Sequence, residues 1–485
     1  NIVLIMCDDM GFSDLGCYGG EIETPNLDRL AAGGLRFTDF HNDAKCSQTR
    51  AALLTGLWNH QSRMLARPNH VTMAEVLGSA GYATLMSGKW HLKGLPPDRG
   101  FDKYFGFLNG CINFYTGRDW GTGKNLMRLG KDEFKAPDDF YSTDAFTDYA
   151  IKFLDEVPQE KPFFLYLAHN APHYPLHALP EDIEKYRGKY DVGWDVIRKR
   201  RYERLKQLGI VDKSWKLSKR DFKVEPWSEL TPSQTEFLIP MMEVYAAMVD
   251  RLDQNIGRLV SHLKKRGEYE NTLIIFLSDN GACPYQRFRG EMKVPGPKES
   301  GIGYDARWAN MCNTPLRLYK QYAHEGGTLT PMIMHWPKVM KQGGGLCRQA
   351  SHLVDLMPTF VELASATYPS TFDGHRVLPM EGKSLVPLLH GKPLDDRPAL
   401  FWEFAGNHAI RDGDWKLVAE RSKPWELYNL ADDRCETNNL AKSMPEKVEL
   451  LSGRYDAWAM RTTAKSHKKC LATKPSKQSQ LFKLP

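Results

Sequence analysis

The chain opens with the apolar run Ile2-Val3-Leu4-Ile5-Met6, which Cys7 and the acidic pair Asp8-Asp9 follow. Residues 82–86, 163–168 and 273–277 form three further runs of similar length, also rich in β-branched or aromatic residues. Short, continuous apolar runs are typical of strands buried on both faces of a sheet. Segments of helical character lie between them, over residues 26–32, 73–80, 143–156 and 235–266. Because strands alternate with helices, the sequence predicts an α/β fold with a large, mostly parallel (mixed) sheet flanked by helices.

Polar side chains follow each of the four runs. They are Asp8 and Asp9, Lys89 and His91, His169 and His173, and Asp279 and Asn280. In open α/β sheets, ligands bind beyond the carboxyl ends of the strands. Carboxylates, imidazoles and an amine at one edge of the sheet therefore predict a single site for an anion and a metal ion.

The sequence changes character from about residue 386. Residues 399–404, 408–411 and 415–418 are short and strand-like, and Asp412-Gly413 is a turn signal between the last two. A helical segment follows near residues 445–460, and a lysine- and serine-rich tail, expected to be extended or loosely packed, begins near residue 462. We therefore expect a large α/β domain over residues 1–385, and a small antiparallel sheet with a helix and tail over residues 386–485.

Composition excludes several classes of protein. Of the 485 residues, 42% are hydrophobic and 26% are charged, which is typical of a soluble globular protein and excludes a wholly disordered one. The net charge of +6 is too small to favour a nucleic-acid partner, although it suits an anionic ligand. No apolar run reaches the roughly 18 residues that a membrane-spanning helix needs. We expect neither nucleic acid nor a membrane as a partner.

The segment Cys46-Ser47-Gln48-Thr49-Arg50 precedes a stretch of small and apolar residues that ends at Thr55-Gly56. Ser47 or Thr49 could cap a helix through this stretch, which would place Cys46 at the helix N-terminus. Free N–H groups and the helix dipole favour negative charge there, and Arg50, one turn along, could point at the same position. The alternative is an inert cysteine buried before a helix.

Segment 46–50 resembles the C-x-P-x-R pattern of the formylglycine-dependent (type I) sulfatases, members of the alkaline phosphatase superfamily, with Gln48 in place of proline. Other segments resemble motifs of this arylsulfatase-like family and occur in the family's order. They are Cys7-Asp8-Asp9-Met10-Gly11, Gly88-Lys89-Trp90-His91-Leu92, Asn170-Ala171-Pro172-His173, Ser278-Asp279-Asn280-Gly281, Lys320 with His324-Glu325-Gly326-Gly327, residues 411–417 and residues 426–430. The resemblance covers roughly residues 1 to 460 and implies an alkaline-phosphatase-like fold.

The resemblance implies hydrolysis of a sulfate ester by cleavage of its S–O bond. A formylglycine-generating enzyme would oxidise Cys46 to formylglycine, and a hydroxyl of the aldehyde hydrate would attack sulfur. His173 would protonate the departing alcohol and His91 would deprotonate the second hydroxyl, so that sulfate leaves in a second step. Arg50, Lys89 and Lys320 would supply positive charge; Lys320 precedes Glu325-Gly326-Gly327, which resembles the family's turn before a strand at residues 330–336. An unmodified cysteine has no neighbouring hydroxyl with which to expel sulfate.

The residues Asp8, Asp9, Asp279 and Asn280 offer only oxygen ligands, which suit a hard divalent cation. Capping and turn formation are the alternative for one acidic pair, but the second pair, Asp279-Asn280, follows another predicted strand. The resemblance implies Ca²⁺ rather than Mg²⁺, with the oxidised residue 46 as a further ligand.

Two other groups of residues allow alternative interpretations. The family motif selects His173, whereas His169 and His177 are either substrate contacts or structural residues, and we expect them to be structural. Residues 197–206 are strongly basic and are either a solvated helix face or a rim that binds a polyanion through Arg198, Arg200 and Arg201. The surrounding residues 177–233 would then select the substrate.

The expected substrate is a sulfated carbohydrate or another organic sulfate ester, and the expected location is periplasmic or secreted. One alternative is a phosphodiesterase or phosphonate monoester hydrolase of the same superfamily, because phosphate and sulfate are both tetrahedral oxyanions. The other is a non-catalytic binder of sulfated glycans in which Cys46 is not oxidised. Retained acid, base and metal-binding residues argue against a binder.

Overall fold

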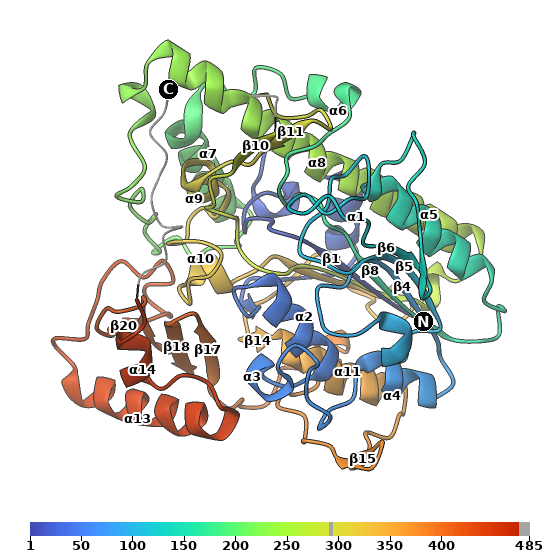
Figure 1. The fold of residues 1–485 in the computed structure, drawn as a ribbon. Coiled ribbons are helices and arrows are strands. Elements are labelled where there is room, and N and C mark those ends of the chain that lie inside the picture. The colour runs from blue at the N-terminus through green and yellow to red at the C-terminus, as the bar shows by residue number, and fades with distance from the viewer. Residues whose placement is uncertain (291–293, 475–485) are drawn as a thin grey trace.

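A mixed sheet of ten strands runs through the centre of the molecule, with helices on both faces (Figure 1). The computed structural model describes residues 1–290 and 294–474. In sheet order, the strands are β13 (Gly345–Cys347), β2 (Leu35–Phe37), β12 (Met332–His335), β9 (Leu273–Ser278), β1 (Ile2–Cys7), β8 (Phe163–Ala168), β4 (Ala83–Lys89), β5 (Lys103–Phe107), β6 (Met127–Leu129) and β7 (Asp132–Glu133).

The four strands predicted from apolar runs are neighbours at the centre of this sheet. Strand β1 pairs in parallel with β8 and β9, and β4 pairs in parallel with β8 and β5. Strand β12 is antiparallel to both β9 and β2, and β6 is antiparallel to β5, which makes the sheet mixed. The predicted α/β fold class is therefore confirmed.

Side chains alternate along β1 between two apolar cores. Val3 and Ile5 belong to the core on one face of the sheet, and Ile2 and Leu4 belong to the core on the other face. This alternation follows from the period of two residues in a strand, and it explains why the run is continuously apolar. Burying one such side chain stabilises the fold by about 1.5–3 kcal/mol.

Two groups of helices cover the two faces (Figure 1). The first group packs with the Val3 core and comprises α1 (Pro25–Ala32), α5 (Ser142–Asp155), α6 (Pro180–Glu184), α7 (Gly193–Gln207), α8 (Pro232–Lys265) and α9 (Ala306–Cys312). The second packs with the Ile2 core and comprises α2 (Cys46–Thr55), α3 (Asn59–Ser62), α4 (Met73–Ser79), α11 (Leu356–Leu363) and α12 (Val386–Leu389). Short strand pairs and helix α10 (Glu325–Thr328) complete residues 1–385; the pairs are β3 (Phe40–His41) with β14 (Ser351–His352), β10 (Phe288–Gly290) with β11 (Ser300–Ile302), and β15 (Thr371–Phe372) with β16 (His375–Arg376).

The C-terminal region forms the predicted small antiparallel sheet. Its order is β17 (Leu400–Phe404), β18 (Asn407–Asp412), β19 (Trp415–Ala419) and β20 (Glu426–Asn429), with α13 (Pro445–Thr462) and α14 (His467–Leu471) packed beside it. Trp402 and Leu417 of this sheet belong to the same core as Leu4 of the large sheet. The tail expected to be extended thus contains a helix, and residues 475–485 lie outside the described residues. A domain boundary near residue 385 stays a proposal.

Buried charges join the small sheet to the rest of the molecule. Asp39, which follows β2, accepts hydrogen bonds from Arg411 at 2.5 and 2.8 Å. Lys416 of β19 lies 2.7 Å from Glu325 and 3.0 Å from Glu436, and all three side chains are inaccessible to solvent. Such pairs are costly to break because the remaining charge would be buried alone.

The arginines of the basic helix α7 do not all face solvent, as both the solvated helix face and the alternative polyanion-binding rim require. Arg201 is 1% exposed and binds Asp14 and Glu21, at 2.6 and 2.7 Å. Arg198 is also buried and donates to the carbonyl oxygen of Ser218. Of the three arginines, Arg200 alone is exposed. Two of them therefore hold α7 against the fold, since their stems and charges lie inside it.

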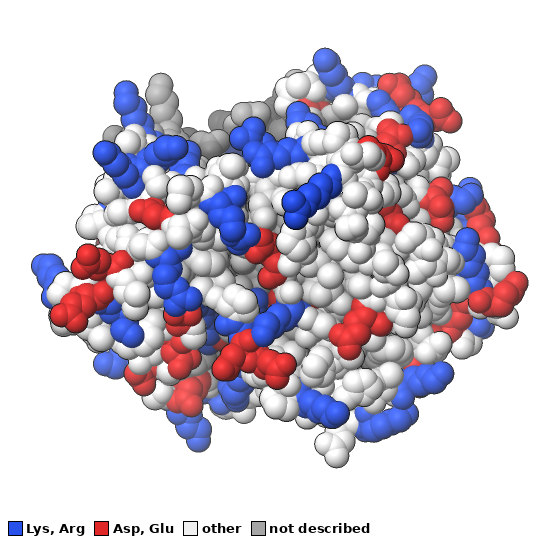
Figure 2. All heavy atoms as spheres, turned by 90° about the horizontal axis from the view of Figure 1, so that it is seen from below, with Lys and Arg blue, Asp and Glu red and all other residues white. Residues whose placement is uncertain are grey.

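No helix within residues 1–290 and 294–474 combines the length and apolarity that crossing a bilayer requires. On the face of the molecule seen from below, basic and acidic side chains are interspersed (Figure 2).

Candidate active site

The carboxyl ends of β9, β1, β8 and β4 lie side by side, because these strands are neighbours in the sheet. Asp8 and Asp9 follow β1, Asp279 follows β9, and Lys89 ends β4. The backbone N–H of Asp279 donates to the carbonyl oxygen of Cys7 at 3.1 Å, which holds two of these loops together. The topology thus collects the polar residues at one edge.

The acidic residues and Asn280 are in direct contact. The N–H of Asp9 donates to Oδ1 of Asp279 at 3.2 Å, and Nδ2 of Asn280 donates to Oδ1 of Asp9 at 2.7 Å. All of these side chains are buried. Loops after β1 and β9 therefore share one polar cluster although about 270 residues separate them.

Three cations neutralise this cluster. Lys89 donates to Oδ2 of Asp8, and Lys320, from a distant loop, donates to Oδ1 of Asp9. Both lysines are almost inaccessible to solvent. Buried lysines of this kind are retained only beside an opposite charge.

Arg50 is the third cation, and it reaches the cluster from helix α2. Its guanidinium donates to Oδ2 of Asp279 at 3.0 Å, to the carbonyl oxygen of Lys89 at 3.0 Å and to the hydroxyl of Tyr166 at 3.2 Å. Tyr166 was not expected in the site, because it lies inside an apolar strand run and carries no local signal.

Burial and neighbouring charges oppose each other on the carboxylates. Burial favours the protonated form of Asp8 and is the largest single influence, but Lys89, His173 and Arg50 together outweigh it and hold the pKa of Asp8 well below its usual range. Burial is likewise outweighed at Asp9, where Lys320 lowers the pKa to about 2. At Asp279, burial and then the charge of Asp8 raise the pKa well above its usual value. The carboxylates of Asp8 and Asp279 therefore lie close enough for their negative charges to repel each other.

Cys46 is the first residue of α2, as expected. The residue at the N-cap is Lys45, and no side chain caps the helix, so the expected capping by Ser47 or Thr49 is wrong. Thr49 instead donates to the carbonyl oxygen of Asp279 at 2.7 Å. This bond ties the first turn of α2 to the loop after β9.

The thiol of Cys46 faces several cations. Burial disfavours the thiolate, but Lys320, Lys45, Lys89 and then His91 outweigh burial and hold its pKa well below the usual value. Lys45 was not singled out from the sequence, although a lysine directly before a predicted helix and a cysteine is a detectable signal. The position thus stabilises negative charge on residue 46.

His91 lies close to Cys46, but not through the extended backbone that was expected after Lys89. Its φ is 56°, in the left-handed region, so the chain turns at this residue. Burial lowers the pKa of the imidazole, and the neighbouring Cys46 opposes this only in part. His91 is therefore neutral at pH 7, with a nitrogen able to accept a proton.

His173 lies on another side of the cluster. Its Nδ1 lies 2.6 Å from the carbonyl oxygen of Tyr174, and its Nε2 lies 3.5 Å from Oδ2 of Asp9. Because a carbonyl only accepts, Nδ1 carries the proton and Nε2 is the exchangeable position. Burial lowers the pKa of His173 to about 4, against the opposing charges of Asp8 and Asp9.

The other two histidines of this segment do not face the acidic cluster. His177 lies with Nε2 at 2.6 Å from the carbonyl oxygen of Ser300, and its Nδ1 accepts from the N–H of Phe114. His169 is fully buried beside Phe146, and burial lowers its pKa to about 3. These surroundings agree with the structural role expected for both, which stays a prediction.

The loop that carries Lys320 is held by close backbone packing at Gly326. A Cβ atom there would lie 2.2 Å from the carbonyl oxygens of Arg317 and Leu318, so no larger residue fits. Residues 325–328 form the short helix α10 before β12, where a turn was expected. The glycine thus allows the Lys320 loop to close over the sheet edge.

The oxygen atoms around Asp8 and Asp9 fit a hard cation. Oδ1 of Asp8, Oδ2 of Asp9 and Oδ1 of Asn280 are buried and have no hydrogen-bond partner among the described residues. Oxygen atoms of Asp8 and Asp279 also lie within 4.8 Å of each other and of the Cys46 sulfur. Carboxylate and amide oxygens are the ligands that Ca²⁺ and Mg²⁺ prefer.

A second acidic group, Asp39 with His41 and Glu325, has similar spacing but a structural role. Its carboxylates already face three cations, which are Arg411, Arg434 and Lys416. Glu436, 3.0 Å from Lys416, is a third carboxylate in this group, so three negative charges balance the three positive ones without an ion.

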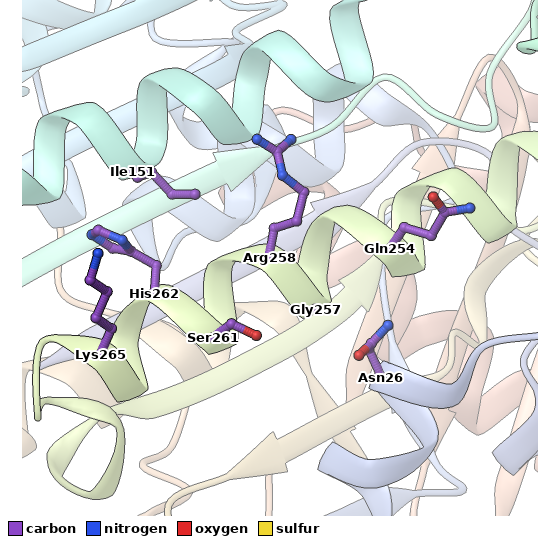
Figure 3. Close-up of a pocket in the computed structure, with 8 residues that line it drawn as sticks. All are labelled: Asn26, Ile151, Gln254, Gly257, Arg258, Ser261, His262 and Lys265. Carbon is purple, nitrogen blue, oxygen red and sulfur yellow. The ribbon is translucent and has the colours of Figure 1, made fainter.

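A surface groove on α8 is separate from the sheet edge described above (Figure 3). Its side chains come from α1, α5 and α8, and include Arg258, His262 and Lys265. Helix α8 ends at Lys265 shortly before β9 begins, so this end lies near the amino ends of the strands. Arg258 pairs with Asp148, and His262 lies 3.0 Å from Asp155.

Comparisons with known proteins agree with this arrangement. The family model described as Sulfatase matches residues 1–366, and that described as N-sulphoglucosamine sulphohydrolase, C-terminal, matches residues 317–452. An uncharacterized sulfatase of Schizosaccharomyces pombe is 36% identical over 92% of this chain and 91% of its own length. An arylsulfatase of Klebsiella aerogenes is 35% identical over 81% of this chain and 92% of its own length. The structure of Ps i-CgsB in complex with k-i-k-neocarrahexaose superposes with a TM-score of 0.69 at 28% identity, covering 95% of this chain and 92% of that one. With these matches and a shared architecture, the chain belongs to the sulfatase family.

Proposed function

We propose that this sulfuric ester hydrolase releases sulfate from a sulfated carbohydrate at the edge of the sheet described above. The observation that carries the proposal is the convergence on Cys46 of Lys45, Lys89, Lys320 and His91. Four basic side chains around one buried position favour a bound oxyanion and a nucleophile that develops negative charge.

The cations supply the electrostatic part of catalysis. Lys89, Lys320 and Arg50 are buried and held in place before substrate binds, so little reorganisation is needed during the reaction. In the proposal, the two lysines stay beside Asp8 and Asp9 and also face the sulfuryl oxygens. They stabilise the negative charge spread over those oxygens, while the electron pair of the breaking S–O bond moves to the departing alcohol oxygen.

Residue 46 and the metal ion would supply the remaining chemistry. Oxidation of Cys46 to formylglycine would supply a hydrated aldehyde as the nucleophile. Asp8, Asp9, Asp279 and Asn280 would hold Ca²⁺, which would supply positive charge beside the sulfuryl group. The basic side chains that surround the thiol of Cys46 would surround the oxidised residue as well. They would therefore stabilise negative charge on the hydrated aldehyde.

The two histidines would divide the proton transfers. His91 is neutral and lies beside residue 46, which suits a base. His173 holds its Nδ1 proton on Tyr174, so that Nε2 is the position that would pass a proton to the departing alcohol oxygen. A bound sulfate ester adds negative charge nearby and raises the pKa of this imidazole, which favours the protonated form.

Two of the comparisons support a carbohydrate substrate. The C-terminal family model is described as N-sulphoglucosamine sulphohydrolase, and the structure of Ps i-CgsB contains k-i-k-neocarrahexaose. A periplasmic or secreted location is part of the proposal, since polymeric sulfated sugars occur outside cells. A formylglycine-generating enzyme would act on the chain during its maturation.

Turnover of matched esters tests the reaction class. Natively produced protein should hydrolyse 4-nitrophenyl sulfate with a larger kcat/KM than the corresponding phosphate or phenylphosphonate ester. Peptide mass spectrometry should show residue 46 as an aldehyde in the same preparation. Faster turnover of the phosphorus esters would favour the phosphodiesterase or phosphonate hydrolase, and an intact thiol without turnover would favour a glycan binder.

Calcium should stabilise the protein. After treatment with EDTA, adding Ca²⁺ at 100 times its dissociation constant should raise the free energy of unfolding by about 2.7 kcal/mol. Asp279→Asn should reduce this gain, because it removes a charged ligand. Thermal unfolding at graded Ca²⁺ concentrations measures the effect.

Asp14 provides the matched control for this experiment. It is equally buried, but Arg201 and Tyr245 bind it outside the cluster. Asp14→Asn should lower stability and keep the response to Ca²⁺. A wild-type protein that does not respond to Ca²⁺ would contradict the proposed metal site.

A further inference from the structure

The segment that follows Asn280 leads out of the polar cluster to a further basic side chain, that of Arg287. Its backbone carbonyl accepts a hydrogen bond from the N–H of Gly303 at 2.9 Å. Its guanidinium carbon lies 4.8 Å from the centre of the Tyr174 ring and 5.8 Å from that of Tyr285. Arg287 is therefore held in place by its backbone and by two aromatic rings.

The position of the Tyr174 ring is itself fixed. A Cβ atom at Gly303 would lie 3.0 Å from Cδ2 of Tyr174, so the glycine makes room for this ring. Trp120 meets the ring edge-on at 6.4 Å. Arg287 thus lies on an aromatic wall, which reduces the entropy it would lose on binding a ligand.

The guanidinium of Arg287 has no carboxylate partner within residues 1–290 and 294–474. Burial would lower its pKa, but Cys283, Cys111 and then Asp9 outweigh burial and raise it. Three buried arginines behave differently; Arg201, Arg307 and Arg434 each bind carboxylates. A half-buried arginine that has no carboxylate partner among the described residues is a candidate binding group for an anion.

Arg287 lies on the side of the site where the alcohol would depart. Its platform, Tyr174, is the residue whose carbonyl oxygen positions His173. In the proposed function, His173 gives its proton to the departing oxygen. The sulfuryl group would meanwhile face Lys89 and Lys320.

We infer that Arg287 binds an anionic group on the alcohol part of the substrate, which makes it a specificity-determining residue for acidic sugar sulfates. The preferred substrate class is a sulfate ester whose alcohol carries a second charge, a carboxylate or another sulfate. This inference rests on the proposed function for the direction of the alcohol. The contact of Arg287 with the alcohol, however, can be measured by binding alone, without turnover.

Binding of two alcohols tests the inference directly. The probes are 5-hydroxy-2-nitrobenzoate and 4-nitrophenol, which differ by one carboxylate. Calorimetry should show that wild-type protein binds the carboxylated alcohol about tenfold more tightly, because a charge-assisted bidentate contact forms. Arg287→Gln should abolish this preference, and Arg287→Lys should keep part of it.

Arg200→Gln is the matched control, because Arg200 is an exposed arginine on α7 outside the site. It should bind both alcohols as wild type does. Equal binding of the two alcohols by wild type, or a preference that survives in Arg287→Gln, would overturn the inference.

The sulfate esters of the same two alcohols separate this inference from the proposed function. Arg287→Gln should lose about tenfold more kcat/KM on the carboxylated ester than on 4-nitrophenyl sulfate, chiefly through KM. Equal losses on both esters would overturn the inference and leave sulfatase activity standing. Absence of turnover by wild type would count against the proposed function, while the binding comparison would still decide the role of Arg287.

Discussion

Replacing Cys46 with alanine should lower kcat for sulfate release by roughly 10⁴-fold or more, because the nucleophile would be lost. The lysines that face the sulfuryl group would remain, so the variant should still bind the sulfate ester. Release of 4-nitrophenol measures turnover, and calorimetry with the intact ester measures binding. A loss confined to kcat would identify residue 46 as the group that reacts.

Cys347→Ala is the matched control for this variant. Cys347 is also buried, but it ends β13 at the far edge of the sheet order. Its loss should leave the turnover of 4-nitrophenyl sulfate at the wild-type level. Substantial activity in Cys46→Ala would contradict the assigned role.

Replacing Lys416 with methionine should lower the free energy of unfolding by about 3–5 kcal/mol, the usual cost of removing one partner from a buried ion pair. Lys416 is inaccessible to solvent and lies 2.7 Å from Glu325 and 3.0 Å from Glu436. Without it, two carboxylates would be left buried beside each other. Urea-induced unfolding of the intact chain measures the change.

Lys423 supplies the comparison for a surface pair. It lies 2.8 Å from Glu420, and its side chain is 53% exposed. Lys423→Met should change the free energy of unfolding by about 1 kcal/mol or less, because solvent screens the pair. If Lys416→Met were equally mild, the buried charges between the two sheets would not be stabilising the fold.

Local pattern was sufficient for the central strands and for several of the longer helices. Residues 163–168 are an apolar run and form β8, and residues 445–460 have helical character and lie in α13. Apolar runs and periodicity report the local burial of a segment, which is why they predict such elements well. The parallel orientation of the four central strands also followed, since helices separate them along the chain.

Local pattern misled where tertiary contacts decide the role of a residue. Arg198 and Arg201 were expected on a basic surface, yet both side chains are buried, and Arg201 forms ion pairs with Asp14 and Glu21. His91 was expected in an extended segment, yet its backbone is left-handed. The partners of Arg201 lie more than a hundred residues away in sequence, and His91 lies beside Cys46, which belongs to another element. No neighbouring residue therefore signals either contact.

The amino-acid sequence by itself determines the order of the motifs and the chemistry of their side chains. These were enough to name the family and the residues to examine. A one-dimensional pattern carries residue types and spacing, and these set which bonds each group can make. Only the folded chain shows that Lys320 reaches Asp9, that Lys45 lies beside Cys46, and that Arg287 has no carboxylate partner among the described residues. Those facts depend on which strands become neighbours and how closely their loops pack, because distance in space is unrelated to separation in sequence.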